Sequence, residues 1–149
     1  MRTTLEIPET VNAKAILWPY MVGLVGAVVM LHIWIAFRGG MIGVVEQLLL
    51  ALIAIGMVVW LLRKRHEIVK LRFGPLLVNA LSFVVISTSF QLHALIQTFR
   101  IGLNEGGLEI AKFLLGTPWF GLTLCMSALW GLGVLIHFAG AIMARGWED

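Results

Sequence analysis

The chain has 149 residues, of which 60% are hydrophobic and only 13% are charged, with a formal net charge of +3 and a mean hydropathy of +0.95. Soluble domains carry about 25% charged residues. This shortage of polar surface excludes a water-soluble enzyme, a free nucleic-acid-binding protein and a disordered regulator. The composition therefore predicts an integral membrane protein whose first partner is the lipid bilayer.

Four segments are long and apolar enough to cross a hydrocarbon core, which takes about 20 residues of helix. Only Glu46 places a formal charge inside a predicted span. We expect Pro118 to begin the last span, because proline suits the first turn of a helix. A short interfacial helix is then left at about 108–115. The sequence thus predicts an all-α, four-helix integral membrane bundle in one domain, with spans at about 15–37, 41–62, 75–99 and 118–144.

A basic segment between the second and third spans sets the expected orientation, because Lys and Arg are retained on the cytoplasmic side. This predicted loop, 63–72, contains five of the eleven basic residues, namely Arg63, Lys64, Arg65, Lys70 and Arg72. Both termini are therefore expected in the cytoplasm, as in a multi-pass protein of a bacterial inner membrane. The same loop could bind anionic headgroups or a partner, although topology alone explains its charge.

Tyr20 and Trp119, near span ends, fit interfacial aromatic anchors.

Three ionisable side chains lie at one predicted depth. Each is six or seven residues from an outer loop, which is about 9 to 11 Å at 1.5 Å per helical residue. Ionisable residues inside spans are expensive and commonly functional. The predicted polar layer consists of His32, Glu46 and His93, with Gln91 and Gln97 nearby.

Four interpretations of this layer stay open. It could be a proton relay or gate, since His titrates near neutral pH. It could hold a b-type haem between His32 and His93, or a divalent metal on two His and one carboxylate. It could instead be structural, with His32 paired to Glu46 and His93 bonded to a backbone carbonyl. His137 lies near the inner face and cannot join the outer pair, and no motif demands a cofactor.

Small and hydroxyl residues mark further candidate faces. Ser87 and Thr88 belong to a polar stripe on the third span, which could line a hydrated pathway or join helices. Ser127, Gly131 and Gly133 predict a close-packing face on the last span, and hence an oligomer contact.

The sequence contains no catalytic signature. We find no phosphate-binding glycine loop, hydrolase elbow, HExxH motif or Cys-rich metal motif. The single cysteine, Cys125, cannot form an internal disulfide. We therefore expect a non-catalytic subunit that assembles with copies of itself or with other membrane subunits, and no nucleic-acid partner.

From about Leu76 onward the chain resembles short, four-helix members of the MotA/TolQ/ExbB proton-channel family. The resemblance is carried by Asn79–Phe83, Gln91–Phe99 and Thr117–Leu122. It implies that the last two helices pack as a ring and that their hydroxyls line an ion path, with Thr117 at the position of a channel threonine and Gln91 at that of another. The acidic residue and the large cytoplasmic loop of energised members have no counterpart here.

The first half is similar to the small membrane subunit of tripartite ATP-independent periplasmic (TRAP) transporters. This second resemblance rests on Glu46, Gly56, Arg63, His66 and Val69, and it implies a subunit that braces a larger transport subunit. The leading expectation is a stator-like or proton-channel-like subunit. The alternatives are a TRAP-type accessory subunit and a single-haem b-type cytochrome subunit.

Overall fold

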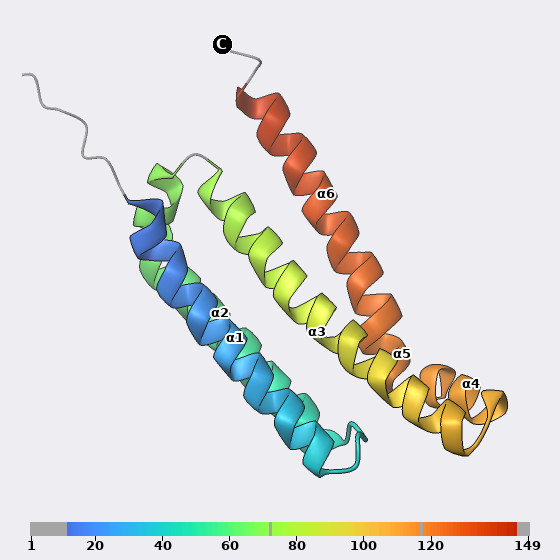
Figure 1. The fold of residues 1–149 in the computed structure, drawn as a ribbon. Coiled ribbons are helices and arrows are strands. Elements are labelled where there is room, and N and C mark those ends of the chain that lie inside the picture. The colour runs from blue at the N-terminus through green and yellow to red at the C-terminus, as the bar shows by residue number, and fades with distance from the viewer. Residues whose placement is uncertain (1–11, 72, 117, 146–149) are drawn as a thin grey trace, which may run out of the picture.

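The computed structural model describes residues 12–71, 73–116 and 118–145, and every element in this part of the chain is helical (Figure 1). As the sequence predicts, four helices are long and apolar enough to cross a membrane. In chain order the elements are α1 (Ala13–Phe37), α2 (Val44–Lys70), α3 (Gly74–Asn104), α4 (Gly107–Leu115), α5 (Pro118–Phe120), the π-helical turn η1 (Gly121–Cys125) and α6 (Met126–Arg145).

The helices α1 and α2 form an antiparallel hairpin. Asn12 caps α1, because its side-chain oxygen accepts hydrogen bonds from the first backbone amides of the helix. The chain then reverses through Gly39 and Gly40, whose φ angles of +80° and +82° suit glycine. Because Gly43 is an extended N-cap, α2 starts at Val44 and not at the expected position 41.

The basic segment predicted as a loop is mostly helical. The helix α2 continues to Lys70, so residues 63–70 form its last two turns. Lys, Arg and Glu are good helix formers, and Lys64 donates to Glu67 one turn later at 2.7 Å. Only a short connection remains before α3, and Arg72 within it lies outside the described residues.

The main buried layer lies between α1 and α3, which run in the same direction. Polar contacts mark both ends of this layer, with Tyr20 and Ser82 hydroxyls 2.6 Å apart near one end and His32 against His93 near the other. Between them, apolar side chains recur every three or four residues, the spacing of one helix face. These buried residues are Leu24, Val28 and Leu31 on α1, and Ile86 and Phe90 on α3.

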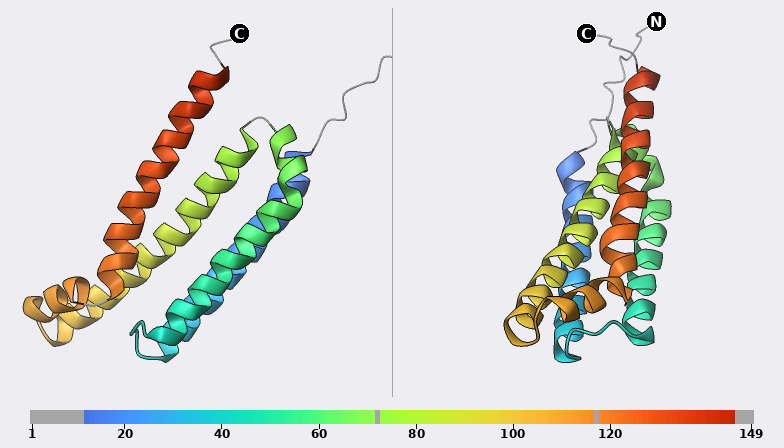
Figure 2. Two further views of the ribbon diagram at one scale, coloured as in Figure 1. Left: turned by 180° about the vertical axis from the view of Figure 1, so that it is seen from behind. Right: turned by 90° about the vertical axis from the view of Figure 1, so that its right-hand side faces the viewer.

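The last helix lies apart from the α1–α2 hairpin. Figure 2 shows α6 beside α3, and α4 across the end where α3 finishes. A groove of about 800 Å³, lined by α2, α3 and α6, separates α6 from α2. The four long helices of the predicted bundle therefore form an open arrangement, with a groove between α2 and α6.

The contact between α3 and α6 uses two of the three predicted packing residues. A Cβ atom at Gly131 would lie 3.2 Å from the Phe83 ring, and Ser127 lies 3.3 Å from the Gln91 amide nitrogen. Gly133, in contrast, has nothing within 4 Å of its Cβ position. Ser127 and Gly131 are thus used inside the chain, and Gly133 is not part of the contact.

This difference predicts unequal effects of two matched substitutions. Gly131→Leu should lower stability by about 1–3 kcal/mol, because the new side chain must push Phe83 and α6 apart. Gly133→Leu should be close to neutral, because its site is open. Thermal unfolding of both variants in the same detergent checks the expectation, and equal losses would contradict the assigned face.

Candidate functional site

Two histidines meet between α1 and α3. The Nδ1 atoms of His32 and His93 are 3.2 Å apart, and the ring centroids are 5.0 Å apart. Both side chains are half-buried. The hydrogen bond therefore joins the first helical hairpin to the second half of the chain.

Aromatic rings hold the two imidazoles in place. The Phe90 ring meets His32 edge-on at 4.7 Å, and the indole of Trp119 stacks on His93 at 5.2 Å. Trp119 is fully buried, and its Nε1 donates to the carbonyl of Gly40 at 3.1 Å. Its expected role as an interfacial anchor is thus replaced by a buried one, because α4 and α3 cover it through Phe113 and Phe90.

The turn between α1 and α2 closes over the pair through Gln97. The amide of Gln97 lies 3.3 Å from His93 Nε2, and the side chain is buried. A Cβ atom at Gly40 would collide with this amide. The turn between α1 and α2 therefore needs glycine for close approach as well as for its backbone angles.

Glu46 does not join the two histidines. Its carboxylate accepts hydrogen bonds from Trp34 Nε1 at 2.9 Å and from the Gly43 amide at 2.8 Å, and lies 3.6 Å from Arg38 Nε. The expected His32–Glu46 pair is therefore wrong, and His93 bonds side chains in place of a backbone carbonyl. The physical reason is that Glu46 stands in the first turn of α2, where a carboxylate satisfies exposed amides and the helix dipole.

The number of protons on the two imidazoles limits what the histidine pair can do. Two neutral imidazoles have four nitrogens and two protons. One proton lies in the Nδ1–Nδ1 hydrogen bond and one sits on an outer nitrogen, so the other outer nitrogen is bare. At the His32 end, Nε2 is buried and has no hydrogen-bond partner. The pair can thus accept a third proton without losing its hydrogen bond, whereas a fourth would place two N–H groups against each other.

The same geometry does not fit a haem or a metal. Two axial imidazoles on one iron place their nitrogens about 4 Å apart, twice a metal–nitrogen distance of about 2.0 Å. The facing nitrogens of His32 and His93 are already 3.2 Å apart, so no porphyrin fits between them. The two-His, one-carboxylate site lacks Glu46, and no group of three metal-type side chains occurs among the described residues.

The predicted pathway residues lie on two sides of α3. Gln91 donates to the Thr123 carbonyl at 2.6 Å, within η1, where a π-helical turn changes the usual pairing of carbonyls. Thr88 is exposed and lines a second groove of about 820 Å³ together with Gln91. Ser87 is buried, and its hydroxyl has no partner. Thr117 lies outside the described residues.

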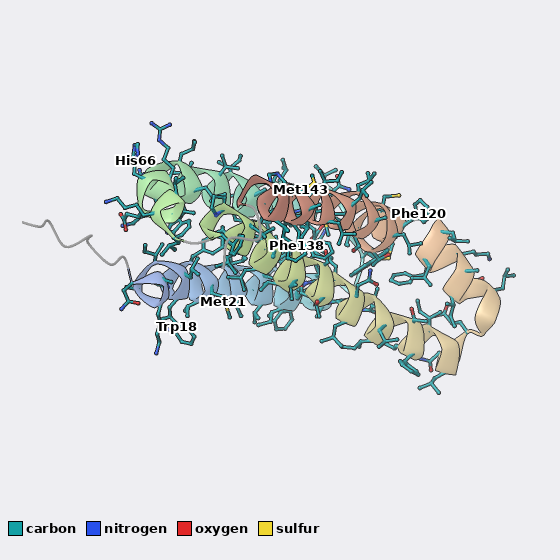
Figure 3. The ribbon with its side chains drawn as sticks, turned by 90° about the horizontal axis from the view of Figure 1, so that it is seen from above. Trp18, Met21, His66, Phe120, Phe138 and Met143 are labelled. Atoms are coloured by element: carbon teal, nitrogen blue, oxygen red, sulfur yellow. The ribbon has the colours of Figure 1, made fainter. Side chains whose placement is uncertain are left out.

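The remaining predicted residues lie apart from the histidine pair. His137 lines the groove between α2, α3 and α6. Figure 3 shows His66 projecting from the end of α2. Gly56, Arg63 and Val69 are also exposed on that helix. Sequence reasoning missed Trp34, Gly40 and Phe90, although the spacing of Gly43 and Glu46 is a capping signal that could have located the carboxylate.

No protein-family model, no curated protein and no solved structure matches the chain. We therefore infer function from the geometry of the site. Its two main features are the hydrogen bond between two histidines at the α1–α3 contact and the unpartnered nitrogen at one end of the pair.

Alanine substitutions at Gly39 and Gly40 should have unequal effects, because only Gly40 lies against the Gln97 amide. Gly40→Ala and Gly39→Ala should each lower the free energy of unfolding by about 1–2 kcal/mol, because alanine is strained in a left-handed backbone conformation. Gly40→Ala should lose about 1 kcal/mol more, because its methyl group displaces the Gln97 amide from His93. Chemical denaturation in one detergent measures the difference. Equal losses would show that the Gln97 contact contributes nothing.

Proposed function

We propose that this chain is a non-catalytic, multi-pass subunit of a larger membrane complex, stator-like or proton-channel-like, in which His32 and His93 form a proton relay. The observation that carries the proposal is the 3.2 Å contact between the two Nδ1 atoms, with His32 Nε2 buried and unpartnered. A bare or unsatisfied nitrogen at the end of a hydrogen-bonded pair is a site where a proton can enter.

Membrane insertion and orientation are part of the proposal. Four apolar helices of sufficient length support insertion. The exposed basic residues Arg63 and Arg65 at the end of α2 support a cytoplasmic position for that end. The beginning of α1 and the end of α6 lie at the same end of the molecule (Figures 1 and 2), so both would face the cytoplasm. We place the complex in a bacterial inner membrane.

The relay step follows from the proton count. A proton binds to the bare outer nitrogen of one ring, the shared Nδ1 proton shifts to the other ring, and the second ring releases a proton from its own outer nitrogen. The pair gains one proton and loses one, so its charge is unchanged after the transfer. The rings then carry the opposite tautomers, and both must regain their first tautomers before another proton can pass in the same direction. The amide of Gln97 can face either tautomer of His93 through its nitrogen or its oxygen.

The position of the pair supports a subunit and not a complete channel. On its inner side, Val28, Ile86 and Phe90 are buried and fill the α1–α3 contact. These apolar side chains leave no continuous series of hydrogen-bonding groups to the Tyr20–Ser82 contact. The proposed relay therefore serves the outer part of a proton path, and partner subunits supply the rest.

Glutamine variants separate a relay from a purely structural contact. Glutamine can donate and accept hydrogen bonds but cannot carry an added proton at neutral pH. His32→Gln and His93→Gln should assemble like the wild type and lose proton flux at least tenfold. The flux is measured with a pH-sensitive dye inside membrane vesicles that carry the assembled complex.

His137→Gln is the matched control, because His137 is an exposed span histidine away from the pair. It should keep wild-type flux. If the two pair variants also keep their flux, the relay is wrong. If they lose assembly together with flux, the contact is structural and the proposal fails equally.

The orientation has its own test. In a Cys125→Ser background, a cysteine at Glu67 should be protected from an impermeant maleimide added to intact cells, whereas one at Glu105 should react. Glu67 and Glu105 lie at opposite ends of the molecule, in α2 and just after α3. The reverse labelling pattern would invert the proposed topology, and labelling of neither residue before or after lysis would contradict membrane insertion with exposed loops.

A further inference from the structure

The groove between α2, α3 and α6 combines a long apolar wall with charge at one end. Its volume is about 800 Å³, and most of its lining is aliphatic or aromatic, including Leu50, Ala54, Met57 and Trp130. Two of its polar side chains are already satisfied within the chain, because Asn79 accepts from Trp130 at 2.8 Å and Ser82 bonds Val78 and Tyr20. The wall is therefore effectively apolar along most of its length.

The basic side chains of the groove are Arg65 and His137, whereas the amide of Gln47 lines the opposite end, in the first turn of α2. Arg65 lies five residues before the end of α2, about 7.5 Å from it along the helix axis. Its Nε contacts His66 at 3.3 Å, and no carboxylate pairs with it in the described part of the chain. His137 of α6 faces the same groove, and none of the described lining residues is acidic. This end is consequently cationic, and no described residue that lines the groove supplies a counter-charge.

Size and charge together select the occupant. A 20-residue helix about 10 Å across and 30 Å long fills roughly 2,400 Å³, which exceeds the empty space of about 1630 Å³ in the groove. Small-molecule sites enclose about 300–1,000 Å³. We propose that this groove binds one anionic phospholipid, with its acyl chains along the apolar wall and its phosphate at Arg65 and His137.

The basic end of the groove, at Arg65 and His137, suits a phosphate monoanion. A guanidinium donates paired hydrogen bonds to phosphate oxygens, and an imidazole N–H can donate another. Basic pockets between membrane helices on the cytoplasmic side are known to hold anionic headgroups. The inference depends on the membrane insertion and orientation proposed above, but not on the histidine relay.

Competition between two lipids tests the site. The full chain, delipidated in detergent, is given equal amounts of phosphatidylglycerol and phosphatidylcholine with identical acyl chains, and retained lipid is counted by native mass spectrometry. We expect one phosphatidylglycerol per chain, retained roughly fivefold over phosphatidylcholine, the effect of about one basic residue at a membrane surface. Arg65→Gln should reduce this preference to less than twofold.

Two matched controls locate the binding. Arg63→Gln should leave the preference unchanged, because Arg63 is exposed on the same helix but does not line the groove. Ala54→Trp should reduce retention of both lipids by filling the groove, whereas Leu52→Trp, on the exposed side of α2, should not. Equal effects of Arg63→Gln and Arg65→Gln would indicate diffuse surface charge and overturn the site.

The remaining outcomes separate this inference from the proposed function. Failure of the chain to enter lipid nanodiscs would overturn the proposed function itself. Normal insertion with equal retention of both lipids would overturn only the lipid site. A photo-reactive residue in place of Leu61, which lines the groove, should cross-link to lipid. Cross-linking to a helix of another chain in its place would show a protein occupant and also overturn the inference.

Discussion

The hydrogen bond between His32 and His93 is the interaction on which the half of the molecule around the α1–α2 turn depends. It joins α1 to α3 where both imidazoles are half-buried. Trp119 stacks on the His93 ring, and its Nε1 donates a hydrogen bond to the Gly40 carbonyl in the α1–α2 turn. Three segments that are distant in the sequence therefore meet around one pair of imidazoles.

The rest of the architecture follows from how the helices share this contact. The helix α3 is central because it receives α1 on one side and α6 on another. Three interactions hold α3 against η1 and α6. The Gln91 amide donates to the Thr123 carbonyl in η1, Trp130 donates to Asn79, and the small residue Gly131 lets the Phe83 ring approach α6 closely. No side-chain hydrogen bond joins α6 to α2 in the described part of the chain, and the groove between them stays open.

Hydropathy predicted the four spans well, because uncharged apolar runs of this length are typical of membrane-crossing helices. It could not predict where α2 ends, because Lys and Arg residues continue a helix into the aqueous layer as readily as they form a loop. Distance from the loops predicted a common depth for His32, Glu46 and His93, but depth does not determine which way a side chain points around its helix. The structure brings the histidines together and turns Glu46 toward Trp34 and Gly43. The role of Trp119 was also out of reach, since its burial depends on Phe113 and Phe90.

The proposed relay requires that one proton lies between the two imidazoles and can move between them. The most direct measurement is nitrogen-15 NMR of the histidine rings in the full chain in lipid nanodiscs at neutral pH. We expect one ring protonated at Nδ1, its partner bare at Nδ1, and a scalar coupling across the hydrogen bond that disappears in His93→Gln. Two rings that are both protonated at Nε2, with no coupling between them, would contradict it.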